Sequence, residues 1–252
     1  MNKQRVVFPL VFLLSSVLIC ILGVGLFLLA GGSFAPEVEP PSEQQNTPEQ
    51  PELPLRVVII DAGHGGEDGG AVGVTGLVEK DLNLDLAKRL AALLEERGYR
   101  VIMTRTEDVL LYDRNTDYHG RKKALDLAAR QAVGDANPDA VFVSLHANTF
   151  SEAIYHGLQV WYSPNNPEAA VLAECIRACV TAQLQPENHR QSKPAGSNIY
   201  LLYHLGTPAV LVECGFLSNP TECRMLEDDA YRDALALALC KGIVAYYEND
   251  AT

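Results

Sequence analysis

The chain has 252 residues, 48% of them hydrophobic, and a formal net charge of −12 at pH 7. This acidic balance argues against a nucleic-acid partner, because binding to phosphates requires a basic face. The length is sufficient for one domain with a sizeable core and for additional segments. The six cysteines form no CxxC pair, so they fit buried small hydrophobic residues better than a thiolate zinc site or a disulfide framework.

The first 30 residues predict an N-terminal transmembrane helix that acts as a membrane anchor. Lys3 and Arg5 precede an uncharged run over residues 6–30. As a helix this run would be about 37 Å long, which exceeds the bilayer hydrocarbon core of about 30 Å. The basic residues predict a cytoplasmic amino terminus, with the rest of the chain outside the cytoplasmic membrane. The alternative is a signal peptide cleaved after Ala35, where the sequence has a small-x-small pattern, but the length of the run favours a retained anchor.

Residues 31–54 predict a disordered linker. They contain five glutamates and many prolines and glutamines, with few large apolar residues. Such a segment cannot bury enough surface to fold, so we expect it to act as a spacer. The folded domain is then expected over residues 55–249.

Within this domain, short apolar runs alternate with amphipathic helical patterns. Strands are predicted at 57–60, 99–105, 140–146, 157–162 (nearer an edge of the sheet), 199–202 and 209–213. Helices are predicted at 79–97, 119–134, 167–184, 220–227 and 229–247, and polar loops at 106–118 and 185–198. The alternation predicts a single α/β domain with a mostly parallel twisted sheet, flanked by helices on both faces.

A glycine-rich loop follows the first predicted strand. Five of the eight residues after Ala62 are glycine, and His64 lies among them. Glycine permits positive φ and close backbone approach, so this loop can place one imidazole at a strand end. Neither GxGxxG nor GxxxxGK[ST] occurs in the chain, so nucleotide binding is not supported.

Three further polar residues are expected to meet His64. Predicted strands end in His146 and Glu213, and Glu79 begins the helix after the glycine loop. The carboxyl ends of parallel strands meet at one edge of a sheet. Two imidazoles and a carboxylate match the His₂Glu ligand set of catalytic zinc sites, and a second glutamate can accept a proton from water.

Each of these residues also has a structural interpretation. Glu79 is favoured as an acid in the first turn of a helix by the helix dipole, and His146 fits a hydrogen-bonded core histidine. Glu213 is harder to explain in this way, because a carboxylate after Val-Leu-Val is costly to bury unless it is paired or metal-bound. The combination of all four therefore favours a metal site.

The residues lie in ordered motifs between positions 56 and 247: Asp61-Ala-Gly-His64-Gly-Gly, Glu79-Lys, Thr104-Arg, Ser144-Leu-His146-Ala-Asn148, and Pro208-Ala-Val-Leu-Val-Glu213-Cys-Gly-Phe-Leu-Ser-Asn219. This set resembles the zinc-dependent N-acetylmuramoyl-L-alanine amidases with an amidase-3-type catalytic domain. Many of them have Asp-Pro-Gly-His where this chain has Asp61-Ala-Gly-His, a change that keeps the acid and the histidine. The resemblance implies that His64, Glu79 and His146 bind Zn²⁺ and that Glu213 is the catalytic acid/base.

Four shorter motifs resemble the spore-cortex and germination amidases within this family: Arg121-Lys-Lys, Lys193-Pro, Tyr200-Leu-Leu and Gly215-Phe-Leu-Ser-Asn-Pro220. The implied reaction is hydrolysis of the amide between N-acetylmuramic acid and L-alanine of the stem peptide in bacterial peptidoglycan. The expected partners are peptidoglycan and, through the anchor, the cytoplasmic membrane. The sequence leaves open whether an activator protein is required and whether the site binds a divalent metal other than zinc.

Several residues around the expected site have two interpretations. Asp61 and Asn148 are expected either to orient the histidines or to stabilise turns. Arg190 and Lys193 are expected either to meet carboxylates of the substrate or to be solvated loop charges.

Two other functions compete with the amidase. A non-catalytic peptidoglycan-binding or regulatory homologue would lack one of the four site residues, and all four are present. A thiol hydrolase would use Cys214, but the sequence around this cysteine shows nothing that would lower its pKa.

Overall fold

The computed structural model describes residues 56–113, 115 and 119–249. The predicted anchor and linker, residues 1–30 and 31–54, lie outside these ranges. Within the described ranges, no helix combines the length and the apolar character needed to cross a bilayer.

The described residues form a single α/β domain with one six-stranded sheet of order β2-β1-β3-β6-β4-β5. The strands are β1 (Val57–Ala62), β2 (Arg100–Met103), β3 (Val141–Asn148), β4 (Gln159–Tyr162), β5 (Lys193–Pro194) and β6 (Ala209–Phe216). The helices are α2 (Glu79–Glu95), α3 (Lys122–Asp135), α4 (Glu168–Gln183), α5 (Tyr200–His204), α6 (Pro220–Glu227) and α7 (Asp229–Asn249). All neighbouring strands are parallel except β4 and β6, so the predicted mostly parallel sheet is confirmed.

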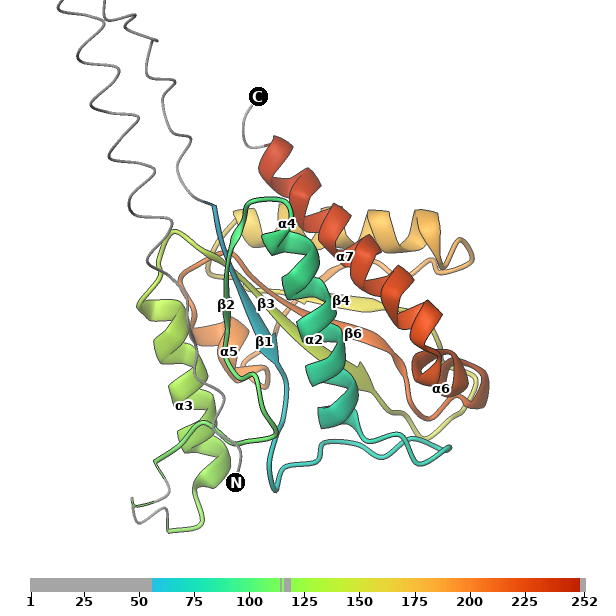
Figure 1. Ribbon diagram of the computed structural model, residues 1–252, viewed down its shortest axis with the longest axis horizontal. Coiled ribbons are helices and arrows are strands. Elements are labelled where there is room, and N and C mark those ends of the chain that lie inside the picture. Colours follow the sequence, from blue (N-terminus) through green and yellow to red (C-terminus); the bar gives the residue numbers. More distant parts are fainter. Residues whose placement is uncertain (1–55, 114, 116–118, 250–252) are drawn as a thin grey trace, which may run out of the picture. The chain divides into compact units, whose positions relative to one another are not determined.

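Alternate strand residues build a separate core on each face of the sheet. Val58 and Ile60 of β1 pack into the larger core with α2, α4, α6 and α7, whereas Ile59 packs into a smaller core with α3 and α5. Figure 1 shows α2 and α7 together in front of the sheet. The prediction of helices on both faces is therefore confirmed.

Helix α2 forms where the sequence predicts it because its leucines recur at helical spacing. Leu82, Leu86, Leu90 and Leu94 are fully buried and lie on one side of the helix. The helix ends before Gly98, which has φ of +82°. Glu79 is its first residue, so the leucines that fix α2 on the sheet also fix the position of this carboxylate.

The strand predicted at 199–202 is wrong, because Tyr200–His204 forms the short helix α5. Leu201 and Leu202 are buried in the smaller core, on the face of the sheet that α3 also covers. A run of four apolar residues does not by its period distinguish a strand from a short buried helix, and here tertiary packing decides. The two residues of β5 lie in the segment predicted as a loop and pair with the end of β4.

Truncation of the leucine row should destabilise the fold. We expect Leu86→Ala to lower the free energy of unfolding by about 2–5 kcal/mol, because it removes a fully buried side chain and leaves a cavity. Urea denaturation measures the change. Lys88→Ala on the exposed side of α2 is the control, with an expected effect below about 0.5 kcal/mol. Equal effects of the two variants would contradict the packing described here.

Candidate metal centre

The glycine-rich loop after β1 carries His64 and passes closely against the side chains of Glu79 and His146. His64 itself has a positive φ of +62°, a conformation that non-glycine residues rarely adopt. A Cβ at Gly63 would lie 2.3 Å from the ring of His146, and one at Gly70 would lie 2.5 Å from Glu79 Oε2. Glycine is required at these two positions because the backbone passes directly against the site residues.

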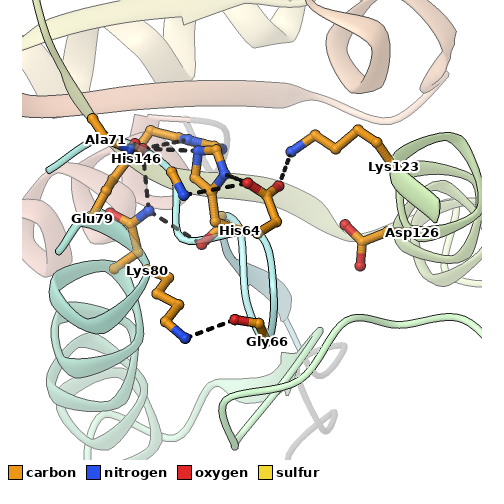
Figure 2. Close-up of polar contacts among 12 residues, drawn as sticks. His64, Gly66, Ala71, Glu79, Lys80, Lys123, Asp126 and His146 are labelled. Atoms are coloured by element: carbon orange, nitrogen blue, oxygen red, sulfur yellow. Dashed lines mark hydrogen bonds and ion pairs between the residues drawn. The ribbon is translucent and has the colours of Figure 1, made fainter. Parts of the chain in front are cut away.

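His64, Glu79 and His146 converge at the carboxyl edge of the sheet, as the sequence predicts. Glu79 Oε1 lies 3.2 Å from His64 Nε2 and 3.0 Å from His146 Nδ1. One nitrogen or oxygen atom from each of the three residues lies within 4.8 Å of the others, which is the spacing of a metal-binding cluster. Figure 2 shows the two imidazoles next to each other, with Glu79 reaching them from α2.

The carboxylate of Glu79 is held by the backbone on both sides. Its Oε2 accepts a hydrogen bond from the N–H of Ala71 at 2.8 Å, and its Oε1 accepts one from the N–H of Ala147 at 3.2 Å. Burial opposes ionisation, but hydrogen bonds and charge from His146 and His64 outweigh it, so the pKa of Glu79 lies well below its usual range. Glu79 is therefore ionised at neutral pH and can serve as an anionic metal ligand.

Asn83 supports this arrangement one helical turn after Glu79. Its fully buried side-chain amide donates to the carbonyl of Gly63 at 3.2 Å and lies 3.5 Å from Glu79 Oε1. The side chain thereby connects α2 to the loop that carries His64.

The other nitrogen of His64 faces a carboxylate from the same loop. Asp68 Oδ1 lies 2.9 Å from His64 Nδ1, close enough for an ion pair although not aligned as a hydrogen bond. Lys123 reaches from α3 to the carboxylate of Asp68 (Figure 2). Burial would lower the pKa of His64, but Glu79 and Asp68 outweigh it and raise the pKa. Burial raises the pKa of Asp68, whereas Lys123 and His64 dominate and lower it to about 2.

Glu213 is the neighbour of His146 across the β3–β6 pair, on the same face of the sheet. Its Oε2 atom is buried and has no hydrogen-bond partner among the described residues. Burial raises the pKa of this carboxyl, the charge of Glu79 raises it further, and His146 and His64 partly oppose the shift. A buried carboxyl group with a raised pKa and no hydrogen-bond partner is a candidate acid/base.

Two buried arginines fix the backbone around His64. Arg130 donates to the carbonyls of Ala62 and His64 at 2.8 and 2.7 Å. Arg105 donates to the carbonyls of Ala62 and Gly63 at 2.8 and 3.0 Å. Because four donor contacts reach three consecutive carbonyls, the loop is held in its unusual conformation by side chains from outside it.

Asp61 acts on this arginine layer and does not bind a histidine. Its carboxylate accepts hydrogen bonds from Arg130, Thr104 and Ser144. Burial raises its pKa, but Arg130 and the two hydroxyls outweigh burial and hold the pKa below its usual range. Of its two sequence interpretations, the structure favours the structural one.

Some site residues were not found from the sequence. Asn83 and Asp68 each follow a candidate ligand by four residues, a weak signal that also fits a solvent-exposed position. Arg130 reaches the His64 backbone over 66 positions, and no local pattern encodes such a contact. Arg105 belongs to the Thr104-Arg motif, but the motif alone does not predict its contacts with the loop carbonyls.

The structure argues against Cys214 as a nucleophile. The side chain is fully buried, and burial together with the charges of Glu213 and Glu222 raises the pKa of its thiol far above its usual value. The reactive form would be the thiolate, which this site disfavours. Cys175, Cys179, Cys214, Cys223 and Cys240 are all free, and the last three are buried whereas Cys175 and Cys179 are half-buried.

An α/β sheet that gathers a His–Glu–His cluster and a second carboxylate at one edge has the arrangement of a metal-dependent hydrolase. Residues 58–245 match the family model Amidase_3, described as N-acetylmuramoyl-L-alanine amidase.

Individual relatives agree with this match. The germination-specific N-acetylmuramoyl-L-alanine amidase of Bacillus subtilis (strain 168) is 36% identical over 197 residues, covering 77% of this chain and 82% of that protein. The CwlD amidase from Clostridioides difficile, solved in complex with the GerS lipoprotein, is 36% identical with a TM-score of 0.73, covering 77% and 100%. The N-acetylmuramoyl-L-alanine amidase AmiC2 of Nostoc punctiforme is 30% identical with a TM-score of 0.66, covering 77% and 97%. The chain belongs to the amidase-3-type N-acetylmuramoyl-L-alanine amidases, a family of peptidoglycan amidases.

Removing the guanidinium of Arg130 should destabilise the domain strongly. In Arg130→Leu, Asp61 and Asp126 would be buried without their cation, and we expect the free energy of unfolding to fall by about 3–5 kcal/mol. Denaturant unfolding measures this change. Arg177→Leu, which removes an ion pair with Glu174 at the surface, is the control and should change stability by less than about 1 kcal/mol. A small effect of Arg130→Leu would show that the arginine does not hold the loop.

Proposed function

We propose that this chain is a zinc-dependent amidase that hydrolyses the bond between the lactyl group of N-acetylmuramic acid and L-alanine of the stem peptide. The observation that carries the proposal is the convergence of His64, Glu79 and His146 beside the unpartnered carboxyl of Glu213. In this proposal the first three residues bind the metal and Glu213 is the catalytic acid/base.

The side chains of His64, Glu79 and His146 fit a catalytic zinc ion. Two imidazoles and one ionised carboxylate are a known zinc ligand set that leaves a coordination position open for water or substrate. The imidazole side chains of His64 and His146 are 17% and 19% exposed, so the site is accessible from solvent. When bound, zinc supplies a Lewis acid that polarises the scissile carbonyl and lowers the pKa of water to about 7.

Glu213 supplies the proton transfer. Its neighbour in the sheet is His146, so its carboxyl group lies beside the proposed metal ligands. It takes a proton from the attacking water and returns it to the departing alanine nitrogen, which leaves as a free amine. Burial raises the pKa of Glu213, which makes its carboxylate a stronger base toward the attacking water.

The proposed organisation places this chemistry outside the cytoplasmic membrane. Residues 1–30 act as the anchor, residues 31–54 as the linker and residues 55–249 as the catalytic domain. A flexible linker of this length has a root-mean-square reach of about 25–30 Å, which allows the domain to reach nearby peptidoglycan.

The proposed biological setting is spore-cortex maturation or germination. The relative from Bacillus subtilis named as germination-specific supports it. The CwlD amidase from Clostridioides difficile is solved in complex with a lipoprotein, so a partner protein is a further candidate for this chain. A non-catalytic peptidoglycan-binding homologue is the alternative, and the presence and convergence of all four residues argue against it.

Hydrolysis of purified peptidoglycan tests the mechanism. Zinc-loaded protein should release stem peptides with a free L-alanine amino terminus, and chelation should abolish the release until zinc is restored. Glu213→Gln should reduce the rate by about 100-fold or more, because the proton acceptor is lost. Glu95→Gln, at an exposed position at the end of α2, is the control and should not change the rate.

A thiol reagent should leave the rate unchanged, since Cys214 is buried. Unaltered activity after chelation or in Glu213→Gln would refute the assigned roles.

The amino terminus of the mature protein tests the anchor. Mass spectrometry of protein from the membrane fraction should detect peptides from within residues 3–30. A mature chain beginning at Pro36 would instead establish a cleaved signal peptide.

A further inference from the structure

A groove of about 240 Å³ lies beside the metal centre, and we call it the Arg190 groove. It is lined by side chains from β4, β5, the end of β6, the loop before β4 and the segment before β5, including Phe150, Gln159, Trp161, Arg190, Lys193 and Phe216. Aromatic rings therefore form part of the groove wall, and the cationic groups of Arg190 and Lys193 lie against two of these rings.

The groove is next to the residues assigned to catalysis. Gln159, at the start of β4, is the cross-strand neighbour of Glu213. Asn148, which also lines the groove, follows His146 by two residues and pairs with Phe216. A substrate whose scissile amide lies at Glu213 therefore has the groove within reach of the residues that follow that bond.

Arg190 is held in place by its neighbours. Its guanidinium carbon lies 4.8 Å from the ring centroid of Phe216, and its Nε donates to the carbonyl of His156 at 3.0 Å. These contacts orient the guanidinium and occupy only one of its three nitrogens. The remaining N–H groups suit a bidentate contact with a carboxylate.

Lys193 adds a second cation at the same place. Its ammonium lies 5.9 Å from the ring centroid of Trp161. Among the residues that the structure describes, neither Arg190 nor Lys193 forms an ion pair with an acid. Glu222 is within electrostatic range of Arg190, but its oxygens accept hydrogen bonds from the N–H groups of Gly157 and Phe216.

Arg190 and Lys193 lie together in the groove of a chain that is acidic overall. The protein carries a net charge of −12, and several of its other cations are paired with acids: Arg89 contacts three aspartates, Lys80 contacts Asp108 and Arg177 contacts Glu174. An acidic protein that leaves two adjacent cations without acids beside its catalytic carboxyl has a local positive site for an anion.

We propose that Arg190 and Lys193 bind carboxylates of the stem peptide, in the residues that follow L-alanine, and so select substrates in which these groups are free. The inference rests on the proposed amidase function and specifies its substrate. Substrates whose carboxylates are amidated lose the charge-assisted contacts and bind more weakly, with no change in the chemical step.

Two soluble substrates test this selection with the full chain loaded with zinc. One is a muramoyl stem peptide with free carboxylates, and the other is the same molecule with those carboxylates amidated. We expect the wild-type KM to be about tenfold or more lower for the free acid, with similar kcat. Arg190→Gln and Lys193→Gln should each raise KM for the free acid by about tenfold and leave KM for the amidated substrate unchanged.

Arg224→Gln and Lys241→Gln are the matched controls, because they remove one positive charge at exposed positions outside the groove and should leave both KM values unchanged. A rise in KM for the free acid with ionic strength in the wild type, weakened in the groove variants, is a further expected result. Equal KM values for the two substrates, or an equal loss for both in the variants, would overturn the inference and indicate that the groove binds an uncharged part of the substrate.

Binding of the released stem peptides separates this inference from the proposed function. Titration calorimetry with the free-acid and the amidated peptide, without muramic acid, measures the groove independently of hydrolysis. Tighter binding of the free acid that disappears in Arg190→Gln supports the groove even if neither muramoyl substrate is hydrolysed, a result that would refute the amidase proposal alone. Equal binding of the two peptides refutes the groove alone.

Discussion

The site depends on a positive charge buried beneath the loop that carries His64. The guanidinium of Arg130 is shielded from solvent, and isolating such a charge from water costs several kcal/mol. Asp61 and Asp126 neutralise it, and its remaining donors bind backbone carbonyls of the loop. The network holds only in one geometry, so His64 is kept at a φ that its sequence alone would disfavour.

The two faces of the sheet contribute differently to this arrangement. The larger core fixes α2 through its leucines and thereby sets the position of Glu79. The opposite face carries the polar layer of Asp61, Ser144 and Arg130, which sets the position of the loop. The His–Glu–His cluster forms where these two independently fixed elements meet, so its precision comes from packing as much as from polar contacts.

Much of this could be predicted from the sequence because it is locally encoded. The leucine spacing of α2 and the apolar strands have clear periods, and the parallel sheet brings their polar ends together, which located His64, Glu79, His146 and Glu213. The strand predicted at residues 199–202 is wrong because a run of four apolar residues is too short to show a period. The contact of Arg130 with the His64 carbonyl joins segments 66 positions apart, and no spacing rule reports it. Asn83 lies one helical turn after Glu79, but that spacing does not predict its contact with Gly63.

One reversal of direction in the sheet has a consequence for how this enzyme can diversify. Because β4 runs antiparallel to β6, it is the beginning of β4 that reaches the catalytic edge. The connection between β3 and β4, residues 149–158, therefore forms a rim of the Arg190 groove while supplying none of the candidate metal ligands. Insertions or deletions in this connection can reshape the substrate-facing wall without altering the reaction centre, which makes it a natural place for substrate preference to evolve.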